Sequence, residues 1–310
     1  MKIIFFGSDD FALAHLKVLI ASSHQVVACV TPTDKPKGRG LAVVFSPVKA
    51  CALKDHIPVL QPLDLNDPRT ISQLKALDSD LFVVIAYGTW LPPKVLEIPR
   101  LFTLNVHGSL LPRYRGAAPI NWAIINGDRE TGLTIMRLNS KMDAGDIVSQ
   151  EKIPIDNNET AVTLRAKMMD RGPSFLLKTI ETIEQRSFTF KPQDKNAVTL
   201  APKLTKALGL IDWRKGACKI HNLVRGLVPW PTAYTYYRGK VLKILETEVV
   251  EENLENFEAG EVMRVTDQGF VVKTAEKSLF IKTVHLEASK PMNASDFVLG
   301  HKLSVGERLG

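Results

Sequence analysis

A short run near the middle of the chain carries side chains suited to acyl transfer. Asn105 and His107 flank Val106, and Gly108 follows at the end of an apolar stretch. If residues 101–106 form a strand, its alternation turns Asn105 and His107 toward the same side. An amide N–H can stabilise the oxyanion that forms when an amine attacks an acyl carbon. An imidazole can support loss of the proton from the attacking nitrogen. The pattern therefore indicates acyl transfer to an amine.

A carboxylate would complete this set by orienting or charging the imidazole. Asp143 and Asp146 both lie in the loop 139–146, which follows a predicted strand at 131–138. If that strand neighbours the strand that ends near His107, either carboxylate could reach the imidazole, and spacing alone does not choose between them. No second His or Cys lies at ligand spacing from His107, so a metal site is not predicted.

The elements that must position these side chains alternate along the first half of the chain. The sequence predicts strands at 3–6, 25–31, 81–86, 101–106 and 131–138, and helices at 11–20, 46–55, 68–77, 118–125 and 160–183. This alternation predicts an α/β fold with a doubly wound, mostly parallel, Rossmann-like sheet. Ligands of such sheets bind beyond the carboxyl ends of the strands. The loops after Phe6, Ala86 and Val106 are therefore the expected binding region.

The pattern changes after about residue 187. A stretch without clear period carries four lysines and reads as a basic connection, and a predicted helix at 217–227 and several short strands follow it. We predict a catalytic domain at 1–189, a basic linker at 190–207, and a small β-barrel or sandwich domain at 208–310. The lysines of the connection are Lys191, Lys195, Lys203 and Lys206.

The composition fits a two-domain globular protein with an acidic partner. The chain has 310 residues, 45% hydrophobic and 24% charged, and a net charge of +7. Three widely spaced cysteines are typical of a reducing compartment. The N-terminal residues do not resemble a signal peptide, and no stretch reaches the length of a membrane span. A cytoplasmic protein without a membrane segment is expected.

A long irregular motif connects these observations to a known family. The run LNVHGSLLPRYRGAAP at 104–119, with Gly127, TGLTIM at 131–136 and DAGD at 143–146, resembles the folate-dependent formyltransferases. The resemblance is strongest to the members that formylate methionyl-tRNA. It covers nearly the whole chain, with further matching segments at 4–8, 34–40, 46–49, 86–88, 211–213 and 229–233.

The resemblance implies a specific activity. A formyl group would pass from 10-formyltetrahydrofolate to the amine of initiator methionyl-tRNA, giving N-formylmethionyl-tRNA for translation initiation. Asn105, His107 and Asp143 would be catalytic, with Asn105 and His107 stabilising the oxyanion. The C-terminal domain would be an OB-like β-barrel, and the protein would be a monomer without a metal.

The resemblance also implies two sets of binding residues. The residues expected to bind the folate are Ser109, Leu110, Leu111, Pro112, Ala86, Tyr87 and Gly88. Those expected to bind the tRNA are Lys35, Lys37, Arg39, Lys203 and Lys206. From charge alone, the loop at 34–40 reads as an ordinary solvated loop, and only the resemblance makes it a tRNA contact.

Three departures from the family pattern are visible. The residues at 41–45 are apolar where the family commonly has basic or polar residues, which suggests a grip on RNA by apolar insertion. Asp9 stands where proline is usual, and Val228 where asparagine is usual. Asp9 lies near the opening turn, where it could alter local packing.

Other functions compete with this interpretation. A formyltransferase acting on an amino sugar nucleotide would share the catalytic residues, and the basic loop at 34–40 favours tRNA over it. Glycinamide ribonucleotide formyltransferase needs no C-terminal barrel, and 10-formyltetrahydrofolate hydrolase normally sits on a longer chain. A non-catalytic RNA-binding protein would not need Asn105, His107 and Asp143. A dehydrogenase would need G-x-G-x-x-G where this chain has Gly7-Ser8-Asp9-Asp10.

Overall fold

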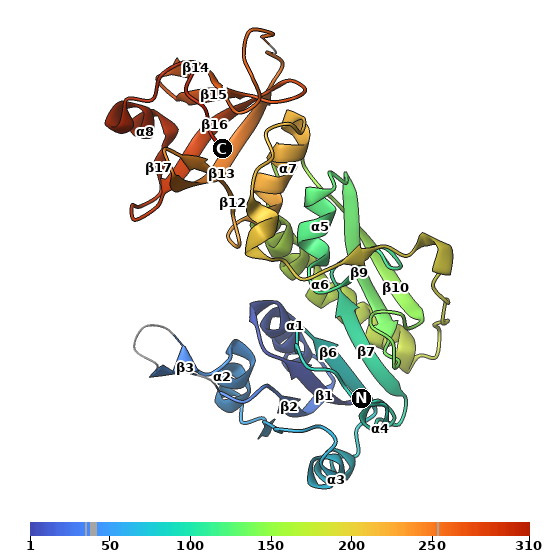
Figure 1. Cartoon of the computed structure of the whole chain (residues 1–310). Helices are drawn as coiled ribbons and strands as arrows, with labels where there is room; N and C mark the ends of the chain where they lie inside the picture. Colours follow the sequence, from blue (N-terminus) through green and yellow to red (C-terminus); the bar gives the residue numbers. More distant parts are fainter. Residues whose placement is uncertain (35, 38–41, 253) are drawn as a thin grey trace. The chain divides into compact units, whose positions relative to one another are not determined.

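The computed structural model describes residues 1–34, 36–37, 42–252 and 254–310, and it divides into two compact units. Unit 1 comprises Met1–Gly116, Thr131–Ile153 and Arg165–Leu200. Unit 2 comprises Ala117–Glu130, Pro154–Leu164 and Ala201–Gly310. Figure 1 follows the chain through both units.

Unit 1 is built on a seven-stranded sheet in the order β10-β9-β7-β6-β1-β2-β5. Pairing is parallel between β1 and β2, β1 and β6, β2 and β5, and β6 and β7, and antiparallel between β7 and β9. The predicted doubly wound, mostly parallel sheet is confirmed. The strands are β1 (Lys2–Gly7), β2 (Gln25–Val30), β5 (Val59–Leu60), β6 (Leu81–Ile85), β7 (Phe102–His107), β9 (Glu130–Arg137) and β10 (Ile147–Pro154).

One core of unit 1 lies between this sheet and two helices. Ile4 and Phe6 of β1 are fully buried in it with Phe82 of β6. Leu74 of α3 (Pro68–Ala76) and Val95 of α4 (Pro93–Leu96) close the same cluster. The central strands are thus apolar at consecutive positions because both faces of a parallel sheet are covered.

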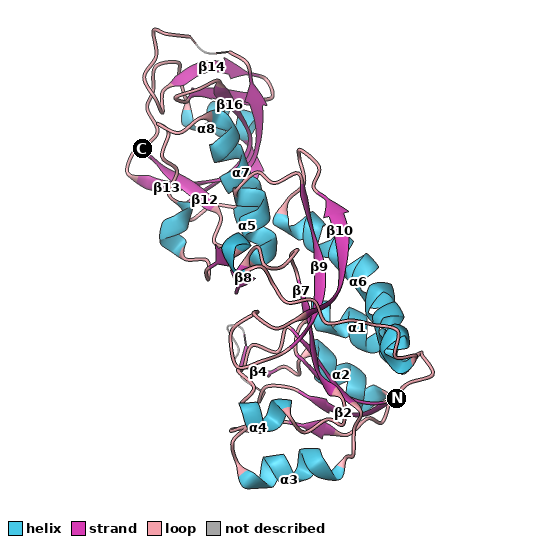
Figure 2. Ribbon diagram, turned by 90° about the vertical axis from the view of Figure 1, so that its right-hand side faces the viewer, coloured by secondary structure: helices cyan, strands magenta, loops and turns pink. Residues whose placement is uncertain are grey.

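The helices α1 (Asp10–Ile20) and α6 (Ala161–Glu184) lie next to each other (Figure 2). Asp9, one of the departures from the family pattern, caps α1 by accepting a hydrogen bond from the Ala12 N–H at 3.0 Å. Its other carboxylate oxygen pairs with Arg165 of α6 at 2.7 Å. A side chain at Gly172 of α6 would meet His15 Nε2 at 2.5 Å, so the absent Cβ permits this close packing. Helix α2 (Pro47–Lys54) begins after the capping residue Ser46.

The chain after α6 runs along unit 1 as a strap, which we define as residues 188–200. Phe188 and Phe190 pack on Phe102 of β7, with ring centroids 5.6 and 5.2 Å away. The Lys191 backbone exchanges two hydrogen bonds with Ile147 at the start of β10. Part of the segment expected as a linker therefore belongs to unit 1. The domain boundaries at 189/190 and 207/208 stay a prediction.

Unit 2 contains the antiparallel sheet β12-β13-β16-β15-β14, with β17 paired to β16. Helix α7 (Ala217–Leu227) buries Ile220 and Val224 in the same core as Leu242 and Phe270 of the sheet. The expected small antiparallel β domain is confirmed. Its strands are β12 (Ala233–Tyr237), β13 (Lys240–Val250), β14 (Val262–Thr266), β15 (Gly269–Lys273), β16 (Ser278–Leu286) and β17 (Met292–Asn293).

The remaining elements are short or peripheral. They are β3 (Pro36–Lys37), β4 (Ala42–Val43), α5 (Pro119–Ile125), β8 (Arg115–Gly116), β11 (Leu200–Ala201), α8 (Ala294–His301) and the 3₁₀ turns Lys195–Ala197 and Lys206–Gly209. Among the described helices, none has the length and apolar character that a membrane span requires.

Candidate active site

The carboxyl ends of β1, β6 and β7 form the expected binding edge of the sheet. The Ser8 hydroxyl, just after β1, donates to the Ala86 carbonyl after β6 at 2.8 Å. The Asn105 amide on β7 donates to the Val84 carbonyl on β6 at 2.9 Å. Side chains thus tie these loops together at one edge. No other hydrogen bond of the Asn105 amide is found within the described chain.

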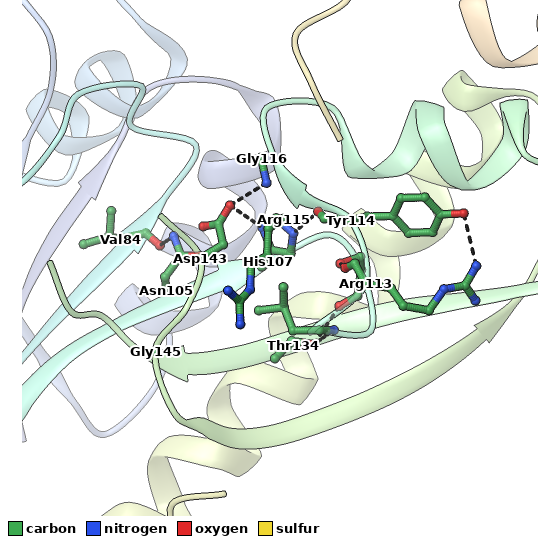
Figure 3. A network of polar contacts seen from close by, with 12 residues as sticks. Val84, Asn105, His107, Arg113, Tyr114, Arg115, Gly116, Thr134, Asp143 and Gly145 are labelled. Carbon is green, nitrogen blue, oxygen red and sulfur yellow. Dashed lines mark hydrogen bonds and ion pairs between the residues drawn. The ribbon is translucent and has the colours of Figure 1, made fainter. Parts of the chain in front are cut away.

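His107, the last residue of β7, is buried, with 6% of its surface exposed. Its Nε2 lies 2.9 Å from the Tyr114 carbonyl. Because a carbonyl only accepts, Nε2 carries the hydrogen in this arrangement. Nδ1 is then the ring nitrogen that faces Asp143, whose Oδ2 is 3.7 Å away. Figure 3 shows the side chains of Asn105, His107 and Asp143 close together.

The structure separates the two candidate carboxylates. Asp143 Oδ2, besides facing His107, accepts a hydrogen bond from the Gly116 N–H at 2.8 Å. Asp146 is paired with Arg137 at 2.6 Å. Asp143 is therefore the carboxylate beside the imidazole, as the family resemblance implied, and Asp146 belongs to a separate ion pair.

The loop that carries Asp143 must turn back on itself to reach His107. Strand β9 runs antiparallel to β7, so that Arg137 at its end lies opposite Leu104, and Thr134 lies opposite His107. Three residues of strand separate Leu104 from His107, which is about 10 Å at about 3.4 Å per residue. Asp143 has a φ of +47°, a left-handed backbone conformation that is uncommon outside glycine.

Gly145 fixes the far side of this loop. A Cβ at Gly145 would lie 1.7 Å from the Arg137 carbonyl oxygen, so no side chain fits there. The Gly145 carbonyl accepts a hydrogen bond from the Gln193 amide at 2.7 Å. The close approach explains why the sequence has glycine at this position of the loop.

The expected folate-binding residues divide by exposure. Ala86 and Gly88 are exposed, and Leu110 and Pro112 are half-buried. The buried members are Ser109, Leu111 and Tyr87. The Tyr87 ring meets Phe6 edge-on at 5.5 Å in the core, and burial raises the pKa of its hydroxyl to about 12. The buried side chains shape the edge of the sheet, and their contact with a folate stays a prediction.

Thr134 and Gln150 hold the loop 109–112 in place. The Thr134 hydroxyl donates to the Ser109 carbonyl at 2.6 Å and accepts from the Leu111 N–H at 3.0 Å. The Gln150 amide donates to the Leu111 carbonyl and to the Thr134 hydroxyl, both at 2.9 Å. The loop after β7 is therefore fixed by its antiparallel neighbour β9 and by the next strand, β10.

The structure describes some of the expected tRNA-binding residues. Lys35 and Arg39 lie outside the described residues, and Lys37 is described by its backbone alone, in β3. Lys203 and Lys206 are exposed in unit 2. Of the apolar segment that departs from the family pattern, Phe45 is 47% exposed. Their contact with RNA stays a prediction.

Three groups that contact His107 or the Asp143 turn were not predicted from the sequence. The Tyr114 carbonyl and the Gly116 N–H act through the backbone, so no side-chain pattern marks them. Gln193 lies about fifty residues after the loop that it contacts, in a stretch without period. Within the described chain, no cluster of three or more His, Cys, Asp or Glu side chains could hold a metal ion.

The arrangement can stabilise charge at two points. Asn105 offers an amide beside a ring whose free nitrogen faces a carboxylate. A proton on His107 Nδ1 would be attracted by Asp143 and would leave the ring positively charged next to the amide. A Rossmann-like sheet that carries an amide, an imidazole and a carboxylate at its carboxyl edge suits transfer of an acyl group.

Comparison with known proteins indicates which acyl group is transferred. The family described as "Formyl transferase" matches residues 1–180, and its C-terminal domain matches residues 203–302. The chain belongs to the formyl transferase family. Its relatives there include proteins named methionyl-tRNA formyltransferase from Acetivibrio thermocellus and Alkaliphilus oremlandii, each 43% identical over 310 residues and the full length of both chains.

A solved structure supports the fold. The N-formyltransferase of Helicobacter canadensis, solved with folinic acid and dTDP-3-aminofucose, matches with a TM-score of 0.68. It is 17% identical, and the match covers 94% of this chain and 100% of that one. At this identity the likeness establishes the fold alone.

Proposed function

We propose that this chain transfers the formyl group of 10-formyltetrahydrofolate to the amine of initiator methionyl-tRNA. The 43% identity to two methionyl-tRNA formyltransferases, over the full length of the chains, supports this acceptor. The single structural observation that carries the chemistry is the juxtaposition of His107 Nδ1 and Asp143 Oδ2, 3.7 Å apart beside Asn105. Under this proposal the product is N-formylmethionyl-tRNA.

The reaction proceeds by addition and elimination at the formyl carbon. The lone pair of the amine attacks this carbon, and the carbonyl electrons move onto oxygen. The free N–H of Asn105 donates to that oxyanion, because the other is directed to Val84. The attacking nitrogen then loses a proton to His107. The oxyanion re-forms the carbonyl as the bond from the formyl carbon to the folate nitrogen breaks, and His107 returns the proton to that nitrogen.

His107 and Asp143 act as a pair in this scheme. The Tyr114 carbonyl fixes the ring through Nε2, which leaves Nδ1 to take up the proton. Asp143 stabilises the resulting positive charge, and the Gly116 N–H holds the carboxylate in position. The charged ring in turn stabilises the oxyanion beside Asn105, since a buried site screens charge less than water does.

The RNA side of the proposal rests on the basic and apolar surface residues. Lys203 and Lys206 are exposed cations that can neutralise phosphates, and the partly exposed Phe45 can insert between bases. The basic loop at 34–40 completes the proposed tRNA contact. We further propose that the protein works as a monomer in the cytoplasm, in keeping with its three free thiols.

Alanine variants of the proposed catalytic set test the chemistry. Asn105→Ala, His107→Ala and Asp143→Ala should each lower kcat by about 100-fold or more, because each removes a charge or donor that acts in the transition state. Circular dichroism should show an intact fold. Initial rates of formyl transfer to charged initiator tRNA provide the measurement.

Asp146→Asn is the matched control, because it alters a neighbouring carboxylate that pairs with Arg137 instead of His107. It should keep kcat within about threefold of the wild type, since exposed ion pairs contribute little. Near-normal kcat in all three alanine variants would end the assignment, and an equal loss in Asp146→Asn would remove Asp143 from its role.

A further inference from the structure

We propose that Gln193, on the strap after α6, is a positioning residue that holds Asp143 in its place beside His107. The inference rests on the proposed function, in which Asp143 is the carboxylate of the catalytic set. Gln193 does not itself touch the imidazole. It acts on the backbone on both sides of the Asp143 turn.

Every hydrogen-bonding position of the Gln193 side chain is used. Its amide nitrogen donates to the Asp143 carbonyl at 2.9 Å and to the Gly145 carbonyl at 2.7 Å. Its amide oxygen accepts from Arg115 Nε at 3.0 Å and from the terminal nitrogen of the same guanidinium at 2.8 Å. Two donors and two acceptor sites are the whole capacity of a primary amide. No other side chain of this length offers the same pair of donors with an acceptor.

The Asp143 turn lies outside any strand, and within it the Asn139 amide donates to the Ala144 carbonyl at 3.2 Å. It leaves β9 beside Leu104 and returns about 10 Å along β7 to reach His107. The positive φ at Asp143 costs energy that the turn's own contacts must offset. Gln193 bridges the carbonyls on either side of Ala144 and so fixes the turn from outside the loop.

The amide oxygen of Gln193 acts on the segment that carries the hydrogen-bond partner of the Asp143 carboxylate. Arg115, which Gln193 binds, directly precedes Gly116, whose N–H donates to Asp143 Oδ2 at 2.8 Å. The Arg115 N–H is itself bonded to the Thr199 carbonyl of the strap at 2.9 Å. One glutamine thus joins the turn that presents the carboxylate to the segment that orients it.

The strap around Gln193 is anchored on either side of it. Before it, Phe190 packs on Phe102, and Arg137 lies over the Phe190 ring at 4.2 Å. After it, the Thr199 hydroxyl accepts from the Tyr114 N–H at 2.9 Å. The Gln193 side chain therefore extends from a backbone held at two points, which lets it fix the Asp143 turn.

Gln193→Met is the variant that tests the proposal, because methionine matches glutamine in length and removes all four hydrogen bonds. We expect kcat to fall about 10- to 100-fold, because the Asp143 carboxylate is then no longer held in its place beside His107. The KM values for the folate and for the tRNA should stay within about threefold. Gln193→Asn, which keeps the amide on a shorter stem, should recover only part of the loss.

A double-mutant cycle separates positioning from general structural damage. In an Asp143→Ala background there is no carboxylate to position, so Gln193→Met should cost less than about twofold in kcat. Gln150→Met is the matched control, because its amide holds the 109–112 loop instead. Its effect should be the same in both backgrounds. An undiminished effect of Gln193→Met in the Asp143→Ala background would overturn the proposal, as would a Gln150→Met effect that vanishes there too.

Amide hydrogen exchange gives a readout that does not depend on activity. The Gly116 N–H is protected by Asp143 Oδ2, so Gln193→Met should raise its exchange rate about tenfold or more, and Gln150→Met should leave it unchanged. Unaltered Gly116 exchange in Gln193→Met would refute the positioning role. A wild-type protein that formylates another acceptor would refute the proposed function alone, since the cycle and the exchange measurement remain valid with that acceptor.

Discussion

His15, a buried histidine of α1, should make the protein less stable in mild acid. Its Nδ1 donates to the Phe11 carbonyl at 2.8 Å, and the two rings lie 5.0 Å apart. Nε2 has no hydrogen-bond partner within the described chain and faces Gly172. Burial lowers the pKa of His15 from its ordinary 6.5 to about 4, because a charged imidazolium would lose its hydration there.

The direction in which the free energy of unfolding changes with pH depends on which state binds the proton. Between pH 6.5 and about 4 the unfolded chain protonates His15 while the folded chain keeps it neutral. Stability therefore falls as the pH is lowered through this window and is unaffected by His15 well above it. Lowering the pH from 7 to 5 should cost about 2 kcal/mol through this one group.

His15→Leu provides the comparison, since leucine has a similar volume and does not titrate. Urea unfolding followed by circular dichroism at pH 7 and pH 5 gives the free energy of unfolding of both proteins. The wild type should lose about 2 kcal/mol more than the variant between the two values. His24 and His221, whose pKa values burial also lowers, titrate in both proteins and cancel. An equal loss in both proteins would refute the reasoning.

Two further predictions concern the turns near the site. Asp9→Ala removes the cap of α1 and the partner of Arg165, so the melting temperature should fall by a few degrees, for a loss of about 1 kcal/mol, while Asp10→Ala, which removes no cap, should change it by less. Gly145→Ala places a Cβ against the Arg137 carbonyl and should displace the Asp143 turn, lowering kcat by about 100-fold or more. Gly300→Ala, whose Cβ would meet nothing within 4 Å, should leave kcat unchanged, and a similar loss in both glycine variants would contradict this account.

Local pattern was sufficient to predict most of the regular structure. Apolar runs at residues 3–6 and 81–86 correspond to β1 and β6, and the predicted helix 217–227 matches α7. Strand β10 was not predicted, because its side chains alternate poorly between Val148 and Lys152. Helix α8 was missed as well, since it spans only eight residues among strands.

The candidate site was predicted in part. Asn105 and His107 could be paired from strand alternation, but spacing could not choose Asp143 over Asp146. The choice depends on a turn that folds back along β7, and such a path is fixed by tertiary contacts. Gln193 fell in a stretch with no period and several lysines, which indicates a linker. Its contacts are single side-chain hydrogen bonds, and no sequence pattern marks those.

Formyl transfer to initiator methionyl-tRNA can be measured in a single assay with three acceptors. Purified protein is incubated with 10-formyltetrahydrofolate and either charged initiator tRNA, free methionine or an amino sugar nucleotide. We expect N-formylmethionyl-tRNA to form at a rate far above that for the other two acceptors. The Asp143→Ala variant should retain only a small part of this rate. Transfer to the sugar nucleotide with none to the charged tRNA would contradict the proposed acceptor, and no transfer to any acceptor would contradict the proposed chemistry.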